Sequence, residues 1–399
     1  MQVYNSFARY NPYTVCKMDT IIEDLFCRGY TNHEILVLLE ESHNVKLSLR
    51  TLERMLCKNQ LWRRRNKTDE AEVASFIHQQ LQTSGRHHGY RWMHQKCWMA
   101  GIITDRETVR QLLRLMDGRG VDLRAQNRLR RRQYYSRGPN YVWHIDGYDK
   151  LKPYGICING CIDGFSRKMI WLEAYKTNND PRIIAGYFID AVYKNNGLPQ
   201  RVRLDHGTEN THVAVMQRFL REMNEDSTEC VTLGPSTGNQ RIERWWATLR
   251  AQCSQFWMDH FEQLREDGHF VDTFIDKSLI QFCFQNTIQE ELNEVLTAWN
   301  NHRIRPTHNP RAPSGRPSVM YAAPSLYGAQ NYLQAVDQIK VDICREDCCV
   351  KDYPCDEDVF HLCVELMAEQ NLAMPDDVFE ITDLYLRLRE MVLNGLDLE

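Results

Sequence analysis

Two short apolar runs that each end in an aspartate constrain the fold of this chain most strongly. Residues 141–146 read Tyr-Val-Trp-His-Ile-Asp, and residues 201–205 read Arg-Val-Arg-Leu-Asp. Runs of this length that are rich in β-branched and aromatic residues predict strands. Asp146 and Asp205 would therefore each mark the end of a strand. A third carboxylate, Glu243, lies in a stretch with helical periodicity.

The pattern around these carboxylates predicts an α/β fold with a mixed five-stranded sheet and flanking helices. We expect an antiparallel meander first and then alternating helices and strands. The expected strands are 141–148, 155–163, 168–175, 201–204 and 230–233, and the expected helices are 181–195, 213–223 and the helix that carries Glu243. Asp205 would lie at the carboxyl end of its strand, where open α/β sheets place ligands. Three carboxylates that converge there can hold a pair of divalent metal ions.

The local frames of the three carboxylates resemble those of the DDE integrases and transposases. Asp205 is followed by His-Gly-Thr-Glu-Asn, and Glu243 follows Gly238 and precedes Trp245 and Trp246. The turn 163–167, Asp-Gly-Phe-Ser-Arg, and the segment 299–306 match further motifs of such cores. The gaps between the carboxylates hold 58 and 37 residues, and the resemblance runs from about residue 140 to 327.

This resemblance implies an RNase H-like catalytic core at 140–327, with a helical extension at its end. It also implies that Asp146, Asp205 and Glu243 are both catalytic residues and ligands of two Mg²⁺ or Mn²⁺ ions. Water would cleave one strand, and the freed 3′-hydroxyl would then attack a target strand. Carboxylate oxygens suit Mg²⁺. Asp146 would bridge the two ions, with Asp205 on one and Glu243 on the other.

Other charged residues near the triad are expected to cap turns, to orient neighbouring groups or to contact DNA. Asp149 and Asp163 are typical of turn caps rather than metal ligands. Glu209 could orient His206 or a substrate, and a structural hydrogen bond with Asn210 is an equal alternative. Arg250 lies two helical turns beyond Glu243 and is our candidate for a DNA contact near the metals.

Residues 1–66 predict a first helix-turn-helix domain. We expect three short helices within 18–62, with a capping box from Thr31 to Glu34 and Ser48 as the cap of the third. Arg50 and Arg54 would point outward from this last helix and could enter a major groove. The basic run 63–65 favours DNA contact.

Residues 67–117 predict a second helical domain of the same kind. A Gly-Tyr-Arg motif at 89–91 and a later Val-Arg-x-Leu-Leu helix resemble the second helix-turn-helix of insertion-sequence transposases. Thr104 and Glu107 form a capping-box pattern before the third helix. Arg106 and Arg110 are the outward candidates for DNA contact.

A basic linker at 118–139 follows, with Tyr134 and Tyr135 among its arginines. Basic residues interleaved with aromatics suit a segment that lies along phosphates. A solvated tether or a nuclear-localisation patch is compatible with the same composition. The candidate phosphate contacts are Arg128, Arg130, Arg131 and Arg132.

Residues 328–399 form an acidic C-terminal segment. The span 337–399 holds 17 Asp and Glu against 5 Lys and Arg, a net charge of −12, so the rest of the chain carries +8. The basic part could face phosphate, and the acidic part should not. We expect a separate segment that acts as a helical cap or a protein-binding module and is dispensable for chemistry. Its cysteines lack paired C-x-x-C spacing, so we do not expect zinc.

Two functional hypotheses follow from the sequence. The first is an active DNA strand transferase that works on double-stranded DNA as a homodimer or tetramer in the nucleus. The alternative is a domesticated integrase kept as a DNA-binding or scaffold factor. A ribonuclease of the same fold is disfavoured by the two helix-turn-helix units. No apolar stretch is long enough to predict a membrane span.

Overall fold

The computed structural model describes residues 18–63, 67–118, 134–221, 230–234, 238–306, 312–349 and 351–396. Three short helices open the chain, as predicted, and they are α1 (Met18–Cys27), α2 (Asn32–His43) and α3 (Leu49–Lys58). The expected capping box from Thr31 to Glu34 is present, and the Ser48 side chain caps α3. These helices share an apolar cluster with Val319 of the later helix α13 (Pro317–Ala322), so the N-terminal unit is docked on the rest of the chain.

The second helical unit contains α4 (Glu70–Leu81), α5 (Tyr90–Met99) and α6 (Arg106–Met116). The cap of α6 differs from the prediction. The Asp105 carboxylate accepts the Thr108 N–H at 2.9 Å, and Thr104 makes no side-chain cap. Thr104 is buried, and its carbonyl accepts the Trp98 indole N–H at 3.2 Å. Aspartate is at least as good an N-cap as threonine, so the chain caps one residue later.

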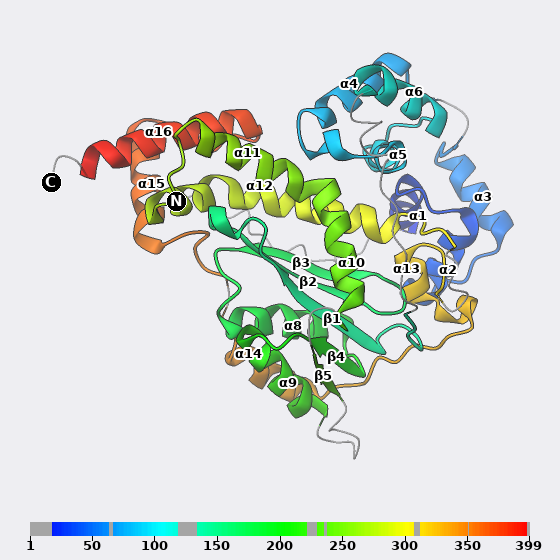
Figure 1. Ribbon diagram of the computed structural model, residues 1–399. Helices are drawn as coiled ribbons and strands as arrows, with labels where there is room; N and C mark the ends of the chain where they lie inside the picture. The colour runs from blue at the N-terminus through cyan, green and yellow to red at the C-terminus, as the bar shows by residue number, and fades with distance from the viewer. Residues whose placement is uncertain are drawn as a thin grey trace.

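A mixed five-stranded sheet forms the centre of the molecule (Figure 1). Its order is β3-β2-β1-β4-β5, and the strands are β1 (Val142–Tyr148), β2 (Cys157–Asp163), β3 (Met169–Tyr175), β4 (Arg201–Leu204) and β5 (Val231–Leu233). The first three strands pair antiparallel, whereas β4 and β5 run parallel to β1. This topology is RNase H-like and confirms the predicted fold class.

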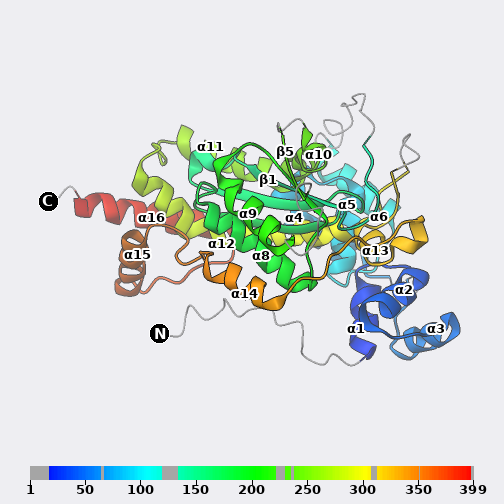
Figure 2. The same ribbon diagram turned by 90° about the horizontal axis from the view of Figure 1, so that it is seen from below.

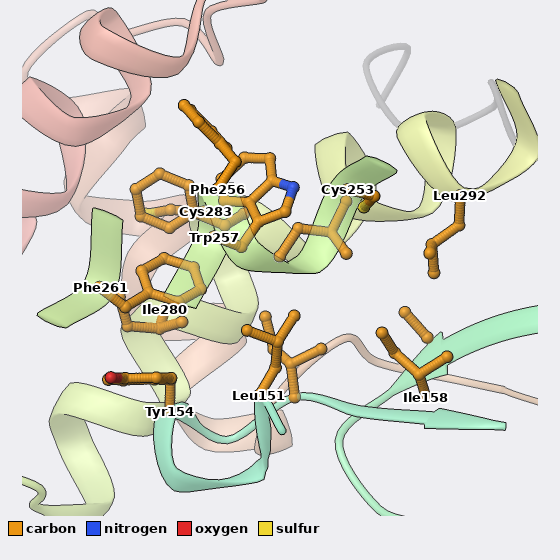
Figure 3. Packing of buried hydrophobic residues seen from close by; sticks show 14 of the residues in the cluster. Leu151, Tyr154, Ile158, Cys253, Phe256, Trp257, Phe261, Ile280, Cys283 and Leu292 are labelled. Carbon is orange, nitrogen blue, oxygen red and sulfur yellow. The ribbon is translucent and has the colours of Figure 1, made fainter. Parts of the chain in front are cut away.

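Helices cover both faces of the sheet. On one face lie α8 (Pro181–Asn195), α9 (Thr211–Arg221) and α14 (Gln338–Glu346), and Figure 2 shows α14 beside α8. The other face carries α10 (Gln240–Leu249), a π-helical stretch (Arg250–Ser254), α11 (Gln255–Glu266) and the long α12 (Phe274–Asn301). Each face has its own apolar cluster. In the second of these layers, Phe256, Trp257 and Phe261 lie across from Leu151 and Tyr154 (Figure 3).

Helix α12 also covers the outer edge of β3. The Asn300 side chain accepts the Met169 N–H at 2.8 Å and donates to the Met169 carbonyl at 3.0 Å. The Gln289 side chain accepts the Ala174 N–H at 2.7 Å and donates to the Leu172 carbonyl at 3.1 Å. Satisfying the open edge of a sheet in this way blocks strand addition there.

The acidic C-terminal segment is packed on the core and is not detached. Helices α15 (Glu357–Glu369) and α16 (Val378–Leu396) contribute to the same apolar cluster as α12. Tyr385 is fully buried, and Arg389 binds the buried Asp276 at 2.7 Å. Charge alone suggested a separate segment, but apolar residues on these helices complete the core. The segment therefore serves as the helical cap that we named as one alternative.

Candidate active site

The fold brings the three predicted carboxylates to one edge of the sheet. Strands β1 and β4 are parallel neighbours, so their carboxyl ends lie side by side. Asp146 lies near the end of β1, and Asp205 directly follows β4. Glu243 lies in the first turn of α10, which packs on β1 and β2. The charges are close enough that Glu243 and Asp205 both raise the pKa of Asp146.

A buried hydrogen-bond chain sets the start of α10 against β1. The Asn239 side-chain NH₂ donates to the Ile145 carbonyl at 2.8 Å. The Asn239 side-chain oxygen is therefore the acceptor for Nδ1–H of His144 at 2.6 Å. Nε2 of His144 then accepts the Tyr134 hydroxyl at 2.7 Å. Burial lowers the pKa of His144 to about 3, so the ring stays neutral. This chain ends one residue before Asp146 and was not predicted, although Asn239 lies inside the motif before Glu243.

Asp146 is the most constrained of the three carboxylates. The residue is 8% exposed, and its Oδ2 accepts the Trp246 indole N–H at 2.8 Å. Burial, and then Glu243 and Asp205, raise the pKa of Asp146 to about 7, against the lowering effect of the indole. Gly160 pairs with Asp146 across the sheet, and a Cβ there would lie 2.8 Å from the Trp246 ring. Glycine at 160 therefore lets the tryptophan reach the carboxylate.

Asp205 is held by the loop that follows it. Its Oδ1 accepts a hydrogen bond from the Asn210 amide and a second from the Gly207 N–H at 3.3 Å. The Asn210 amide also reaches Glu209 at 3.2 Å, which is the structural hydrogen bond named as one alternative for Glu209. Burial and the nearby Asp205 raise the pKa of Glu209.

The turn residues behave as expected. Asp163 is buried and accepts the backbone N–H groups of Asn140, Phe165 and Ser166. Asp149 pairs with Lys152 at 3.1 Å. Both aspartates therefore have partners of their own beside the triad.

The three carboxylates offer only oxygen donors, which fits Mg²⁺ or Mn²⁺. Within the described residues, however, no three His, Cys, Asp or Glu side chains are gathered closely enough to hold one ion together. Glu243 is the exposed member, and burial together with Asp205 raises its pKa. Of the C-terminal cysteines, Cys355 and Cys363 are buried in the cluster with α12, and Cys344 in the cluster with α8.

The arginines predicted to contact DNA differ in their partners within the protein. Exposed side chains on α3 and α6 include Arg50, Arg54, Arg106 and Arg110, and Arg110 pairs with Glu107 at 3.1 Å. Arg250 is exposed where the π-helical stretch begins, and it donates to Gln255 at 2.7 Å. Arg128, Arg130, Arg131 and Arg132 lie outside the described residues.

Arg63, which we read as favouring DNA contact, is used inside the protein. Its guanidinium lies 4.3 Å from the Phe26 ring centroid and 5.2 Å from that of Trp98. It also donates to the Tyr30 carbonyl. This arginine therefore joins the first helical unit to the second, and it adds nothing to the argument for DNA binding.

Fold and site together define an α/β core that presents carboxylates at the end of a mixed sheet. In a comparison with protein families, residues 133–322 match the model of the integrase core domain. The match supports an integrase-type catalytic core with a polynucleotidyl transferase-like function, and it implies DNA binding. No curated protein matches the chain. Among the described residues, no helix has both the length and the apolar character needed to cross a membrane.

Proposed function

We propose that this protein is a DDE-type DNA strand transferase in which Asp146, Asp205 and Glu243 are the catalytic carboxylates. The observation that carries the proposal is the convergence of these three side chains at one sheet edge, inside the region that matches the integrase core domain. The raised pKa of Asp146 supports it, because strongly perturbed carboxylates cluster at functional sites.

The residues would share two divalent ions between them. Asp146 would bridge both, with Asp205 on one and Glu243 on the other, so that each ion needs only two protein carboxylates. Mg²⁺ is commonly held by one or two carboxylates together with substrate phosphates and water. This division is compatible with the absence, among the described residues, of three side chains around one point. When bound, such ions activate the attacking oxygen and stabilise the leaving oxygen of an in-line displacement at phosphorus.

The protein's own side chains prepare that chemistry. Trp246 orients Asp146 through the hydrogen bond from its indole N–H to Oδ2. Asn210 orients Asp205 in the same way through one oxygen. Because Asp146 has a pKa of about 7, it must lose its proton to become a ligand, and cation binding and deprotonation are therefore coupled. Water would first cleave one DNA strand, and the 3′-hydroxyl freed by this cleavage would then attack a target strand.

The remaining parts of the proposal concern DNA and assembly. We propose that residues 1–66 and 67–117 act as two DNA-binding domains, joined by the basic linker 118–139 to the core at 140–327. Their exposed arginines Arg50, Arg54, Arg106 and Arg110 would contact phosphate or base edges. Paired strand transfer needs at least two active sites, so a homodimer or tetramer in the nucleus is part of the proposal.

The alternative is a domesticated DNA-binding or scaffold factor that no longer cleaves DNA. The C-terminal segment 328–399 could serve a protein partner in that case. The grouping of three carboxylates favours catalysis. A scaffold has no need to keep a carboxylate at position 146, where burial and the neighbouring acids disfavour its charged form.

Cleavage assays distinguish the two functions. Purified protein is incubated with a supercoiled plasmid and with candidate element-end duplexes, with Mg²⁺ or Mn²⁺ and with chelator. We expect metal-dependent nicking that Asp146→Asn, Asp205→Asn and Glu243→Gln each abolish while duplex binding survives. Asp149→Asn is the matched control, because this nearby carboxylate pairs with Lys152. Near wild-type cleavage by the Glu243→Gln variant would refute the triad, and metal-independent wild-type binding without cleavage would favour the scaffold.

A further inference from the structure

A cavity lies on the face of the sheet that α8 covers. It has a volume of about 230 Å³ between β3 and α8. Its lining includes Trp171, which packs in the apolar cluster on the α8 side, whereas Asp146 contacts Trp246 on the α10 side. The polar residues that line the cavity are Lys168, Glu173, Tyr187, Asp190, Lys194 and Asn195.

The acidic residues of this cavity already have cationic partners. Glu173 pairs with Lys351 at 2.6 Å, and Asp190 pairs with Arg345 at 3.5 Å. The lysines differ, because within the described residues neither Lys168 nor Lys194 has a carboxylate partner. Neither lysine is therefore neutralised by a direct ion pair at the cavity, and Asp163 acts on Lys168 only from beyond ion-pair distance.

Lys168 is the more unusual of the two lysines. Its ammonium lies 4.1 Å from the centroid of the Tyr321 ring, and burial lowers its pKa to about 8. Burial outweighs the opposing effect of Asp163 on this pKa, and a bound anion relieves the cost of burying a cation. Its neighbour in the lining, Tyr187, has a buried hydroxyl for which the described part of the chain offers no hydrogen-bond partner. An unsatisfied hydroxyl carries its own desolvation cost.

We propose that this cavity binds a small oxyanion of the phosphate class. Lys168 and Lys194 would supply its charge, and the Tyr187 hydroxyl would donate a hydrogen bond to it. Charged donors form the stronger hydrogen bonds with such anions. The volume exceeds what one water molecule needs, so an anion of this size has room. Because the cavity faces away from Asp146, the bound phosphate is not the one that undergoes cleavage, and the site does not depend on the proposed function.

The test is direct binding of inorganic phosphate to the full chain by calorimetry, against chloride at matched ionic strength. We expect saturable binding that weakens at least tenfold, about 1.4 kcal/mol, in Lys168→Gln. Tyr187→Phe removes only the hydroxyl and should weaken binding several-fold. Lys340→Gln is the matched control, because Lys340 also lies over an aromatic ring, 5.0 Å from the centroid of Phe219, but outside the cavity. It should bind as the wild type does.

Labelling locates the site and separates the sources of phosphate. Phosphate should protect Lys168, and not Lys340, from an amine-acylating reagent, as mapped by mass spectrometry. A short DNA duplex at equal phosphate concentration should protect Lys168 only if the site takes backbone phosphate. Absence of saturable phosphate binding would overturn the proposal. Binding that is equally strong in Lys168→Gln and Tyr187→Phe would overturn it as well, because the anion would then lie elsewhere.

Discussion

Replacing Asp146 with asparagine should stabilise the metal-free protein while it removes a proposed metal ligand. The carboxylate is buried, and its pKa rises from 3.8 to about 7 mainly through burial and then through Glu243 and Asp205. Folding therefore opposes the charged form. Asparagine has nearly the same shape and can still offer an oxygen to the Trp246 indole, so little packing is lost.

The magnitude follows from the pKa shift. Each pKa unit corresponds to about 1.4 kcal/mol, so the full shift sets an upper bound of about 4 kcal/mol above neutral pH. Rearrangement of the exposed Glu243 relieves part of the repulsion, and we expect a gain of about 1–3 kcal/mol. For a core of this size that gain corresponds to roughly 2–10 °C in melting temperature.

The sign of the pH dependence is fixed by the same shift. The folded state holds the Asp146 proton more tightly than the unfolded state, so the wild type loses stability as pH rises from about 4 through about 7. The advantage of Asp146→Asn should therefore be largest near pH 8 and shrink steadily toward pH 4. Saturating Mg²⁺ should stabilise the wild type more than the variant, because only the wild type keeps the ligand.

Melting temperatures with chelator at several pH values measure the effect. Asp163→Asn is the control, because this second buried carboxylate accepts three backbone N–H bonds. An amide cannot accept all of them, so this variant should lose about 1–3 kcal/mol even though burial raises the pKa of Asp163 as well. The reasoning would be refuted if Asp146→Asn melted at or below the wild-type temperature near pH 8 while Asp163→Asn behaved as expected.

Three further predictions concern the rest of the molecule. Trp246→Phe removes the indole donor and should raise the pKa of Asp146, so the acid limb of the cleavage profile should move to higher pH; an unchanged limb would contradict a role for the hydrogen bond. Arg50→Ala with Arg54→Ala should weaken duplex binding and flatten its salt dependence, measured by fluorescence anisotropy, whereas Lys340→Gln should not. Deleting residues 337–399 should lower the melting temperature and expose apolar surface to a hydrophobic dye, because α15 and α16 complete the cluster with α12; an unchanged melting temperature would restore the view of a detached segment.

The sheet and its helices were predictable because each has a local signal. Alternating apolar residues defined the strands within two residues, and Pro181 marked the start of α8 as observed. Parallel pairing of β1 and β4 then forces Asp146 and Asp205 to one edge. Two carboxylates of the candidate site therefore follow from strand ends alone.

The contacts that tune the site were not predictable, because they join residues far apart in the chain. The Trp246 bond to Asp146 spans 100 positions, and the Asn239 bond to His144 spans 95. The sequence places Trp246 just after Glu243 but does not indicate that its indole reaches Asp146. The prediction that the acidic C-terminal segment is separate from the core was wrong for a similar reason. Net charge says nothing about apolar residues such as Tyr385 on the inner face of a helix.

The three carboxylates are held to different degrees, and this difference matters for the chemistry. Asp146 is fixed by its strand and by Trp246, and Asp205 is fixed by Asn210. Glu243 is exposed, and within the described residues its carboxylate has no hydrogen-bond partner. In the proposed mechanism, two ligands would thus be in place before a cation arrives, and only Glu243 would lose rotational freedom, which costs at most about 2 kcal/mol. Because repulsion between Asp205 and Glu243 is relieved at the same moment, cation binding and movement of Glu243 toward the sheet favour each other.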